Sequence, residues 1–165
     1  MNPITKTYVQ LTTDERQQIL DLILLGNEVD SSTLPTSLSQ SALIGIYKDK
    51  DKVIATATIK KPLGSYKKGI FTKAKTNLSA DNYFFELGYV IVDENHRNKK
   101  LGQTLCQELC KLFLSKNIFA TTRTNNTYMQ KILADNLFIE QGTPYCSRDN
   151  TTLLKLFTKQ YQLTT

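Results

Sequence analysis

The sequence contains few of the residues on which metal, disulfide or nucleophile chemistry depends. Its 165 residues include three cysteines and one histidine. An odd cysteine count and the four-residue spacing of Cys106 and Cys110 indicate neither a disulfide framework nor a zinc knuckle. His96 has no second histidine beside it to form a metal site, and no Gly-x-Ser-x-Gly elbow is present. We therefore expect Cys106 and Cys110 to be buried in a helix, His96 to be exposed, and no metal to bind.

The sequence also lacks a long hydrophobic segment. Its longest apolar run, residues 19–25, is interrupted by Asp21 and is too short to span a bilayer. The first six residues contain no signal-peptide core. With 40% hydrophobic residues the chain can form an ordinary core. These features predict a single cytoplasmic domain, residues 1–165, with no membrane partner.

Positive charge is concentrated in one segment. The net charge is +6, and residues 48–75 hold nine lysines against two aspartates, so the remainder is slightly acidic. The lysines fit a solvated turn and loop, or an electrostatic funnel for an anionic ligand. The segment has no arginine, so bidentate readout of bases or phosphates is unsupported. We therefore do not expect a nucleic-acid partner.

Apolar periodicity and turn residues predict eleven elements. A capping box, Thr12 with Glu15, is expected to begin the first helix, which Gly26 ends. The expected buried faces are Ile19, Leu20, Ile23 and Leu24 in this helix and Leu105, Leu109 and Leu112 in the helix at 101–114. Residues 60–82 form a long connection that we expect to be functional or mobile, and residues 158–165 a frayed tail. The expected strands are 5–11, 43–47, 53–59, 84–92, 118–122, 137–140 and 151–157, and the expected helices are 12–26, 35–41, 101–114 and 126–134.

The most informative stretch is residues 84–114, which predict a strand, a cationic turn and a helix. A helix N-terminus attracts anions through its unpaired N–H groups and its dipole. Here it is preceded by Arg97, Lys99 and Lys100, and Gly102 allows close backbone approach. Neither a Gly-Lys-Ser/Thr nucleotide loop nor a Gly-x-Gly-x-x-Gly motif is present. The sequence therefore predicts a site for another class of phosphorylated ligand.

This loop resembles the pyrophosphate motif of the GNAT superfamily of N-acetyltransferases, Arg/Gln-x-x-Gly-x-Gly/Ala. It stands here as Arg97-Asn98-Lys99-Lys100-Leu101-Gly102, with Lys100 in place of the first glycine. Residues 126–138 resemble the second signature, an Asn, a helix and Gly-Phe, with Leu137 replacing the glycine. The resemblance implies the GNAT fold, an α/β (α+β) fold whose central mixed, mostly antiparallel twisted sheet of about seven strands is flanked by about four helices.

The resemblance also implies acetyl-CoA as co-substrate and assigns residues to it. Backbone groups of the fourth strand would pair with the pantetheine arm, and the loop would hold the pyrophosphate. Asn126 would contact the arm or cap a helix. The implied cofactor-binding residues are Val90, Ile91, Val92, Arg97, Asn98, Lys99, Lys100, Leu101, Gly102, Gln103, Thr104 and Asn126.

Glu86 lies eleven residues before Arg97, where some members carry a general base, and it interrupts an otherwise apolar strand. The alternative is a strand glutamate paired with a nearby lysine. Leu133 occupies the position at which many members carry a tyrosine as general acid. That role is therefore vacant, or is taken by Tyr128, Tyr145 or Cys146; Tyr128 completes our predicted catalytic pair with Glu86.

The first functional hypothesis is an N-acetyltransferase that moves an acetyl group from acetyl-CoA to a primary amine by direct transfer. The departures at Lys100, Leu133 and Leu137 leave open an acyl-CoA-binding module with weak catalysis. The lysine-rich segment leaves open an amine carried on a charged tRNA. In this fold the acceptor is set by the first helices and the loop before the fourth strand, here residues 29–40 and 60–82. A small molecule or a peptide could be the acceptor, and the resemblance allows a homodimer.

Overall fold

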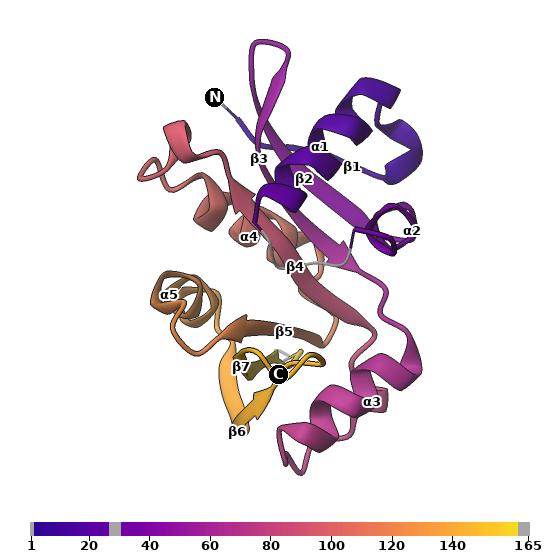
Figure 1. The fold of residues 1–165 in the computed structure, drawn as a ribbon, viewed down its shortest axis with the longest axis vertical. Helices are drawn as coiled ribbons and strands as arrows, with labels where there is room; N and C mark the ends of the chain where they lie inside the picture. The colour runs from indigo at the N-terminus through magenta and orange to yellow at the C-terminus, as the bar shows by residue number, and fades with distance from the viewer. Residues whose placement is uncertain (1, 27–30, 162–165) are drawn as a thin grey trace. The chain divides into compact units, whose positions relative to one another are not determined.

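The computed structural model describes residues 2–26 and 31–161, which fall into two compact units (Figure 1). Unit 1 comprises residues 1–61 and 87–112, and unit 2 comprises residues 62–86 and 113–165. Strand β4 belongs to both, because its first two residues lie in unit 2 and the rest in unit 1. The predictions for residues 29–30 and 162–165 lie outside the described residues.

Unit 1 contains the strand order β1-β2-β3-β4, with β1–β2 and β2–β3 antiparallel. Its short 3-10 turns are Tyr8–Gln10 and Glu94–His96. Its strands and helices are β1 (Ile4–Lys6), α1 (Thr13–Leu25), α2 (Leu34–Ser39), β2 (Leu43–Asp49), β3 (Lys52–Lys60), most of β4 (Phe85–Val92) and α4 (Leu101–Leu112).

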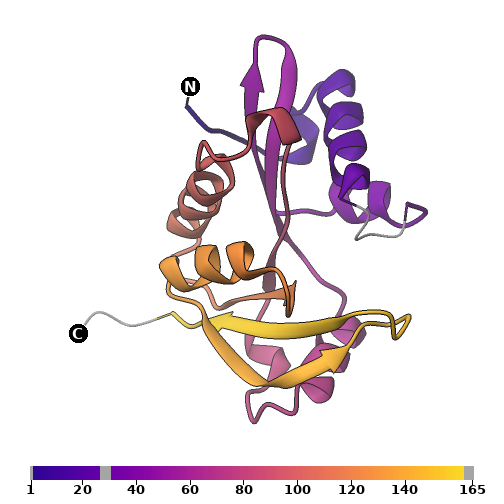
Figure 2. The ribbon, with the colours of Figure 1, turned by 60° about the vertical axis from the view of Figure 1, so that its left-hand side comes forward.

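The two faces of the unit 1 sheet carry different helices, because alternate strand residues point to opposite sides. Ile44 and Ile46 of β2 join the core cluster formed with α1 and α2. Gly45, between them, faces α4, where an added Cβ would lie 3.1 Å from Leu105. Figure 2 shows α1 and α4 on opposite sides of these strands. The absence of a side chain at Gly45 therefore lets α4 pack closely on β2.

The start of α1 confirms the predicted capping box. The Glu15 amide donates to the Thr12 hydroxyl at 3.1 Å, and the Glu15 carboxylate accepts from the Thr12 amide at 3.0 Å. The same carboxylate pairs with Lys6 at 2.8 Å and with Lys48 at 3.4 Å. The buried Glu15 carboxylate is therefore paired with two lysines and one backbone amide, which meets the requirement for burying a charge.

Unit 2 contains the strand order β5-β7-β6, in which both pairs are antiparallel. The parallel ladder between β4 and β5 consists of Phe85 opposite Ile118 and Glu86 opposite Phe119. A short 3-10 turn spans Ala80–Asn82. The remaining elements are α3 (Gly64–Lys73), β5 (Ile118–Arg123), α5 (Thr127–Asp135), β6 (Ile139–Cys146) and β7 (Leu153–Lys159).

Helix α3 packs on unit 2 through aromatic contacts and one backbone bond. The Phe71 ring lies 5.2 Å from the Tyr83 ring and meets the Phe119 ring edge to face at 5.6 Å. At the end of the helix, the Thr143 amide of β6 donates to the Ala74 carbonyl at 2.8 Å. Gly142 has a φ of +64°, and a Cβ there would lie 1.8 Å from the same carbonyl oxygen. Gly142 is thus required both by its conformation and by this close approach.

The predicted order of elements is confirmed, with α3 as an addition. The described residues form seven strands, mostly antiparallel, and five α-helices rather than four. The predicted long connection, residues 60–82, is mainly α3. Its two glycines, Gly64 and Gly69, have low helix propensity, and its apolar positions are too few to give a clear helical period. These features explain why the sequence did not predict it.

Five smaller predictions were wrong. The expected frayed tail, residues 158–165, starts too early, because β7 continues to Lys159. The first strand ends at Lys6, because the chain turns into a 3-10 helix before Leu11. Leu112, expected in the core stripe of α4, is 61% exposed, whereas Cys106 and Cys110 are buried as predicted. Leu22 rather than Leu24 completes the buried face of α1. His96 is not fully exposed: its side chain is held between two carboxylates, as described below.

The end of α5 explains why a glycine is typical at position 137. The Phe138 amide donates to the Leu133 carbonyl, and the Leu137 amide to the Ala134 carbonyl, both at 3.0 Å. This is the Schellman arrangement, in which the residue after the C-cap adopts a left-handed conformation. Leu137 has a φ of +66° and is 75% exposed. Leu137 therefore adopts a conformation that costs a residue with a Cβ about 1 to 2 kcal/mol.

Candidate active site

The loop before α4 contains two residues in the left-handed conformation. Asn98 has a φ of +63° and Lys100 a φ of +57°, whereas Lys99 between them does not have a positive φ. Alternation of this kind turns neighbouring N–H groups toward a common point, as in anion-binding nests. The first bond inside α4 runs from the Thr104 amide to the Lys100 carbonyl at 3.0 Å. The amides of Leu101 and Gly102 precede this bond, in the first turn, where helix amides point away from intrahelical acceptors.

Lys100 occupies the position of the first glycine of the motif, and its left-handed φ explains that preference. A Cβ destabilises this conformation by about 1 to 2 kcal/mol. Lysine adopts the left-handed conformation here, so its presence introduces strain and an additional cation. Arg97, Lys99 and Lys100 are all exposed.

Gly102, unlike Lys100, does not have a positive φ, so its backbone conformation does not require glycine. A Cβ at Gly102 would lie 3.4 Å from both Val90 and Val92 of β4, which is ordinary contact distance. Packing within unit 1 therefore tolerates a small side chain at this position. The two valines point toward α4, whereas Ile91 packs with the α1 cluster on the opposite face.

Strand β4 departs from regular geometry just before these residues. Tyr89 has a φ of +49° in mid-strand, and the Lys60 ammonium lies 4.6 Å from the centre of its ring. A Cβ at Gly88 would lie 2.8 Å from the Lys60 side chain. Such irregularities interrupt the strand pairing and redirect side chains near functional sites.

Asp93 fastens the loop to the β2–β3 hairpin. Its carboxylate accepts from Lys52 at 2.9 Å and from the Asn95 amide at 3.0 Å, and it lies 3.1 Å from the His96 ring. The bond from Lys52, followed by that from His96, lowers the pKa of Asp93 to about 2. The other nitrogen of His96 lies 3.5 Å from Asp49. His96 therefore links two carboxylates of unit 1 and helps to set the entry to Arg97.

Glu86 lies in unit 2, at the start of β4, and is only 3% exposed. The hydroxyl of Tyr66, on α3, donates to Oε1 of Glu86 at 3.3 Å. Burial, and then the negative charge of Glu86, raise the pKa of the Tyr145 phenol well above its ordinary value. A phenol of raised pKa is a weaker acid, which argues against Tyr145 as a proton donor to a thiolate. Sequence reasoning missed Tyr66 because α3 was not predicted.

The remaining predicted residues of unit 2 lie on or beside α5. The Asn126 side chain accepts from the Met129 amide at 3.0 Å, so Asn126 is the helix N-cap. Tyr128 is 58% exposed, whereas Leu133 is fully buried. Cys146 is exposed on β6. Leu133 is therefore a core residue, and its position supplies no acid.

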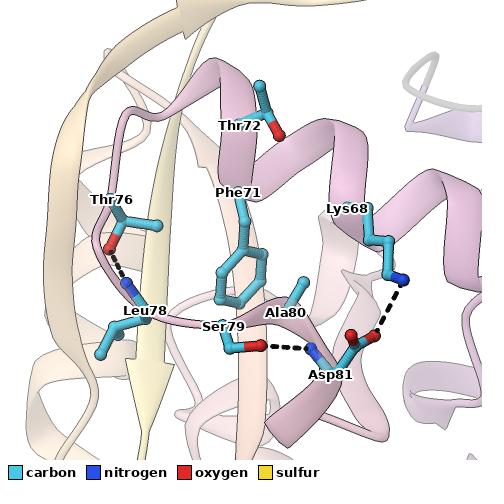
Figure 3. Close-up of a pocket in the computed structure, with 8 residues that line it drawn as sticks. All are labelled: Lys68, Phe71, Thr72, Thr76, Leu78, Ser79, Ala80 and Asp81. Carbon is cyan, nitrogen blue, oxygen red and sulfur yellow. Dashed lines mark hydrogen bonds and ion pairs between the residues drawn. The ribbon is translucent and has the colours of Figure 1, made fainter.

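A pocket of about 250 Å³ lies on unit 2, between α3 and the loop that follows it (Figure 3). Lys68 and Asp81 pair across it at 3.3 Å, and both side chains are more than 60% exposed. Thr76 and Ser79 bond to backbone amides of the same loop. Its lining contains none of the predicted site residues.

Several lysines of the basic segment bond to the protein itself. Lys48 pairs with Glu15, Lys52 with Asp93 and Lys68 with Asp81. Lys67 is buried and donates to the Tyr83 carbonyl at 3.0 Å. These bonds favour a structural role for much of the segment over an electrostatic funnel.

The chain matches the profile of the acetyltransferase (GNAT) family over residues 14–134. It therefore belongs to that family. The loop at Arg97–Thr104 and Glu86 both fall inside the matched region. No curated protein sequence matched the chain.

Solved structures share the fold at low identity. Escherichia coli ElaA superposes with a TM-score of 0.70 at 14% identity, covering 97% of this chain and 100% of ElaA. The Escherichia coli ribosomal-protein-S18-alanine N-acetyltransferase gives 0.69 at 13%, covering 99% and 97%. The Salmonella typhimurium protein yncA, solved with its cofactor acetyl-CoA, gives 0.68 at 13%, covering 100% and 97%. These likenesses establish the GNAT fold.

The described residues contain neither a membrane-spanning helix nor a cluster of metal ligands. No helix within residues 2–26 and 31–161 is long and apolar enough to cross a membrane. The same residues contain no group of three histidine, cysteine, aspartate or glutamate side chains that could hold a metal ion.

Proposed function

We propose that this protein transfers an acetyl group from acetyl-CoA to a primary amine of a small molecule or peptide. The observation that carries the proposal is the loop of unit 1, in which left-handed Asn98 and Lys100 precede the N-terminus of α4. Family membership and the acetyl-CoA found in yncA support this choice of ligand. Acetyl-CoA would supply the acyl group as a thioester.

The loop fits a pyrophosphate in shape and charge. Amides of residues 98–102 would donate to phosphate oxygens, and the Arg97 guanidinium would form charge-assisted bonds to them. The Thr104 amide and hydroxyl both donate to the Lys100 carbonyl, so they are not available to a phosphate. Gly102 would allow the backbone to approach the ligand. Backbone groups of Val90, Ile91 and Val92 would pair with the pantetheine amides and stabilise charge developing on the carbonyl oxygen. Asn126 would remain a helix cap that also borders the arm.

In the chemical step the amine nitrogen forms a bond to the carbonyl carbon while the carbon–sulfur bond breaks. Glu86 would take the amine proton, directly or through a water, since its carboxylate is buried and held by Tyr66. The bonding electrons leave with the thiolate, which takes a proton from Tyr128 or from solvent. Tyr128 is exposed enough to exchange protons with water.

The acceptor class is left open by the fold. The name of the S18-alanine N-acetyltransferase describes action on a protein, and its fold is the same as that of this chain. An acyl-CoA-binding role with weak catalysis is the second candidate, favoured by the buried Leu133 at the position of the usual acid. Thiolate departure without an acid lowers the rate and still permits turnover.

A thermal-shift titration with acetyl-CoA, CoA and ATP tests the ligand, because binding to the native state raises the melting temperature. We expect a rise with acetyl-CoA and CoA that is weaker in Arg97→Ala and absent with ATP. Thiol release in the presence of a panel of amines then tests catalysis, with Glu86→Gln as the control. Binding without amine-dependent release would favour the second candidate, and no binding at millimolar acetyl-CoA would reject both.

A further inference from the structure

The buried carboxylate of Glu86 has two tyrosines around it, both within unit 2. Tyr66, on α3, donates to Oε1 of Glu86. Burial, followed by the negative charge of Glu86, raises the pKa of Tyr145 on β6. The two tyrosines differ in exposure: Tyr145 is 7% exposed and Tyr66 is 46% exposed. Tyr66 is therefore the tyrosine that contacts both Glu86 and solvent.

Helix α3 holds Tyr66 in place through its neighbours. Lys67, the next residue, donates to the Tyr83 carbonyl, and its ammonium lies 5.0 Å from the centre of the Phe84 ring. Ile70 and Phe71 are buried in the core cluster of unit 2. The helix is thus anchored to the residues that lead into β4. Its first turns cannot shift without breaking a buried bond.

The bond between Tyr66 and Glu86 is long for a hydroxyl donor. At 3.3 Å it exceeds the usual distance of about 2.8 Å. Bonds of catalytic groups often lengthen in the absence of substrate and tighten when the substrate arrives. A hydroxyl that is half exposed and loosely bonded can adjust to a proton arriving on the carboxylate.

We propose that Tyr66 is a positioning residue that orients the Glu86 carboxylate to receive the proton of the acceptor amine. This role rests on the proposed function, because it requires Glu86 to be the base. The hydroxyl bonds to one carboxylate oxygen and so restricts the orientation of the group. Loss of this bond widens the range of carboxylate orientations, so a smaller fraction of encounters with the amine leads to proton transfer.

Tyr66→Phe tests this role, because it removes the hydroxyl and keeps the ring. Tyr161→Phe is the matched control: Tyr161 lies in the same unit and is 45% exposed. The probe is acetyl-CoA with the best acceptor among spermidine, phenylalanine amide, kanamycin and a short peptide with a free N-terminus. We expect Tyr66→Phe to lower kcat by about tenfold, ~1.4 kcal/mol in activation free energy. The KM for acetyl-CoA and the melting temperature should stay at wild-type values, and Tyr161→Phe should match wild type.

A double variant shows whether Tyr66 acts through Glu86. If it does, adding Tyr66→Phe to Glu86→Gln lowers the rate no further, because the positioned group is already lost. Loss factors that multiply, or Tyr66→Phe kinetics equal to those of Tyr161→Phe, would overturn the role of Tyr66 and leave the proposed function intact. Wild-type rates in Glu86→Gln would overturn Glu86 as the base, and the positioning role with it.

Discussion

The loop of unit 1 and the Glu86 cluster of unit 2 are assembled in opposite ways. Arg97 to Thr104 are consecutive, and one turn with one helix start gives them their shape. Glu86, Tyr66 and Tyr145 come from three elements that are far apart in the sequence. The local site can tolerate a residue such as Lys100, because the neighbouring backbone sustains its shape. The cluster depends on packing, so one substitution affects all of its members.

The largest expected effect is a loss of catalytic rate without a loss of acetyl-CoA binding, which would distinguish the Glu86 cluster from the loop. Glu86→Gln removes the proposed base without changing the size of the side chain, and loss of a general base typically costs a factor of about 10² to 10⁴ in rate. We expect such a loss in kcat for the amine, measured by thiol release, with the acetyl-CoA thermal shift unchanged. A shift that disappears together with the activity would show that the two regions are not independent.

The second expected effect is on acetyl-CoA binding rather than on the reaction with the amine. Arg97→Ala removes a charge-assisted bond worth about 1.5 to 3 kcal/mol, so the Kd for acetyl-CoA should rise by about ten- to a hundredfold. The KM for the amine should change little. Isothermal titration measures the Kd, and Lys111→Ala, at the far end of α4, is the matched control. Equal Kd values for the two variants would place the anion site elsewhere.

The third expected effect is on stability, and a pair of variants compares the backbone strain in the two units. Lys100→Gly and Leu137→Gly each relieve a left-handed Cβ, so each should stabilise the protein by about 1 kcal/mol. That gain corresponds to roughly 2 to 4 °C in melting temperature for a chain of this size.

Only Lys100→Gly should also affect ligand binding. Loss of its cation should weaken acetyl-CoA binding by about threefold at low salt, with a smaller difference at high salt. Leu137→Gly should bind as wild type does. A lower melting temperature in either variant would contradict the strain argument.

The smallest effect concerns Asp93. Its pKa in the folded state, about 2, lies below the ordinary value of 3.8, so its contribution to stability is complete above about pH 4 and disappears as the pH falls toward 2. Lys52→Ala should therefore melt below wild type at pH 5, and the gap should close near pH 2. Thermal melts across this range measure it. Because Lys52 is 65% exposed, the gap should be small. A constant gap at all pH values would assign the loss to something other than this pair.

The loop is formed by consecutive residues and the Glu86 cluster by distant ones, and this difference decides how much of each the sequence predicts. The loop was predictable because charge, glycine spacing and helix start are all local signals. The left-handed φ of Lys100 and Leu137 was not, since lysine and leucine give no local signal for it. Tyr66 could not be connected to Glu86, because α3 itself lacks a clear periodicity and the pairing is tertiary. The capping box at Thr12 and the cap at Asn126 were predictable because each involves residues only three apart in the sequence.

The contact between Ala74 and β6 limits where sequence change can accumulate. Any residue other than glycine at position 142 would place a Cβ against the Ala74 carbonyl, so we expect position 142 to accept only glycine. Insertions after Lys73 would displace the same carbonyl from the Thr143 amide. The family resemblance implies that residues 60–82 help to set the acceptor, so we expect acceptor preference to vary with the solvent-facing positions of α3 other than Tyr66. A designer seeking a new acceptor would randomise those positions and keep Tyr66, Ala74 and Gly142 unchanged.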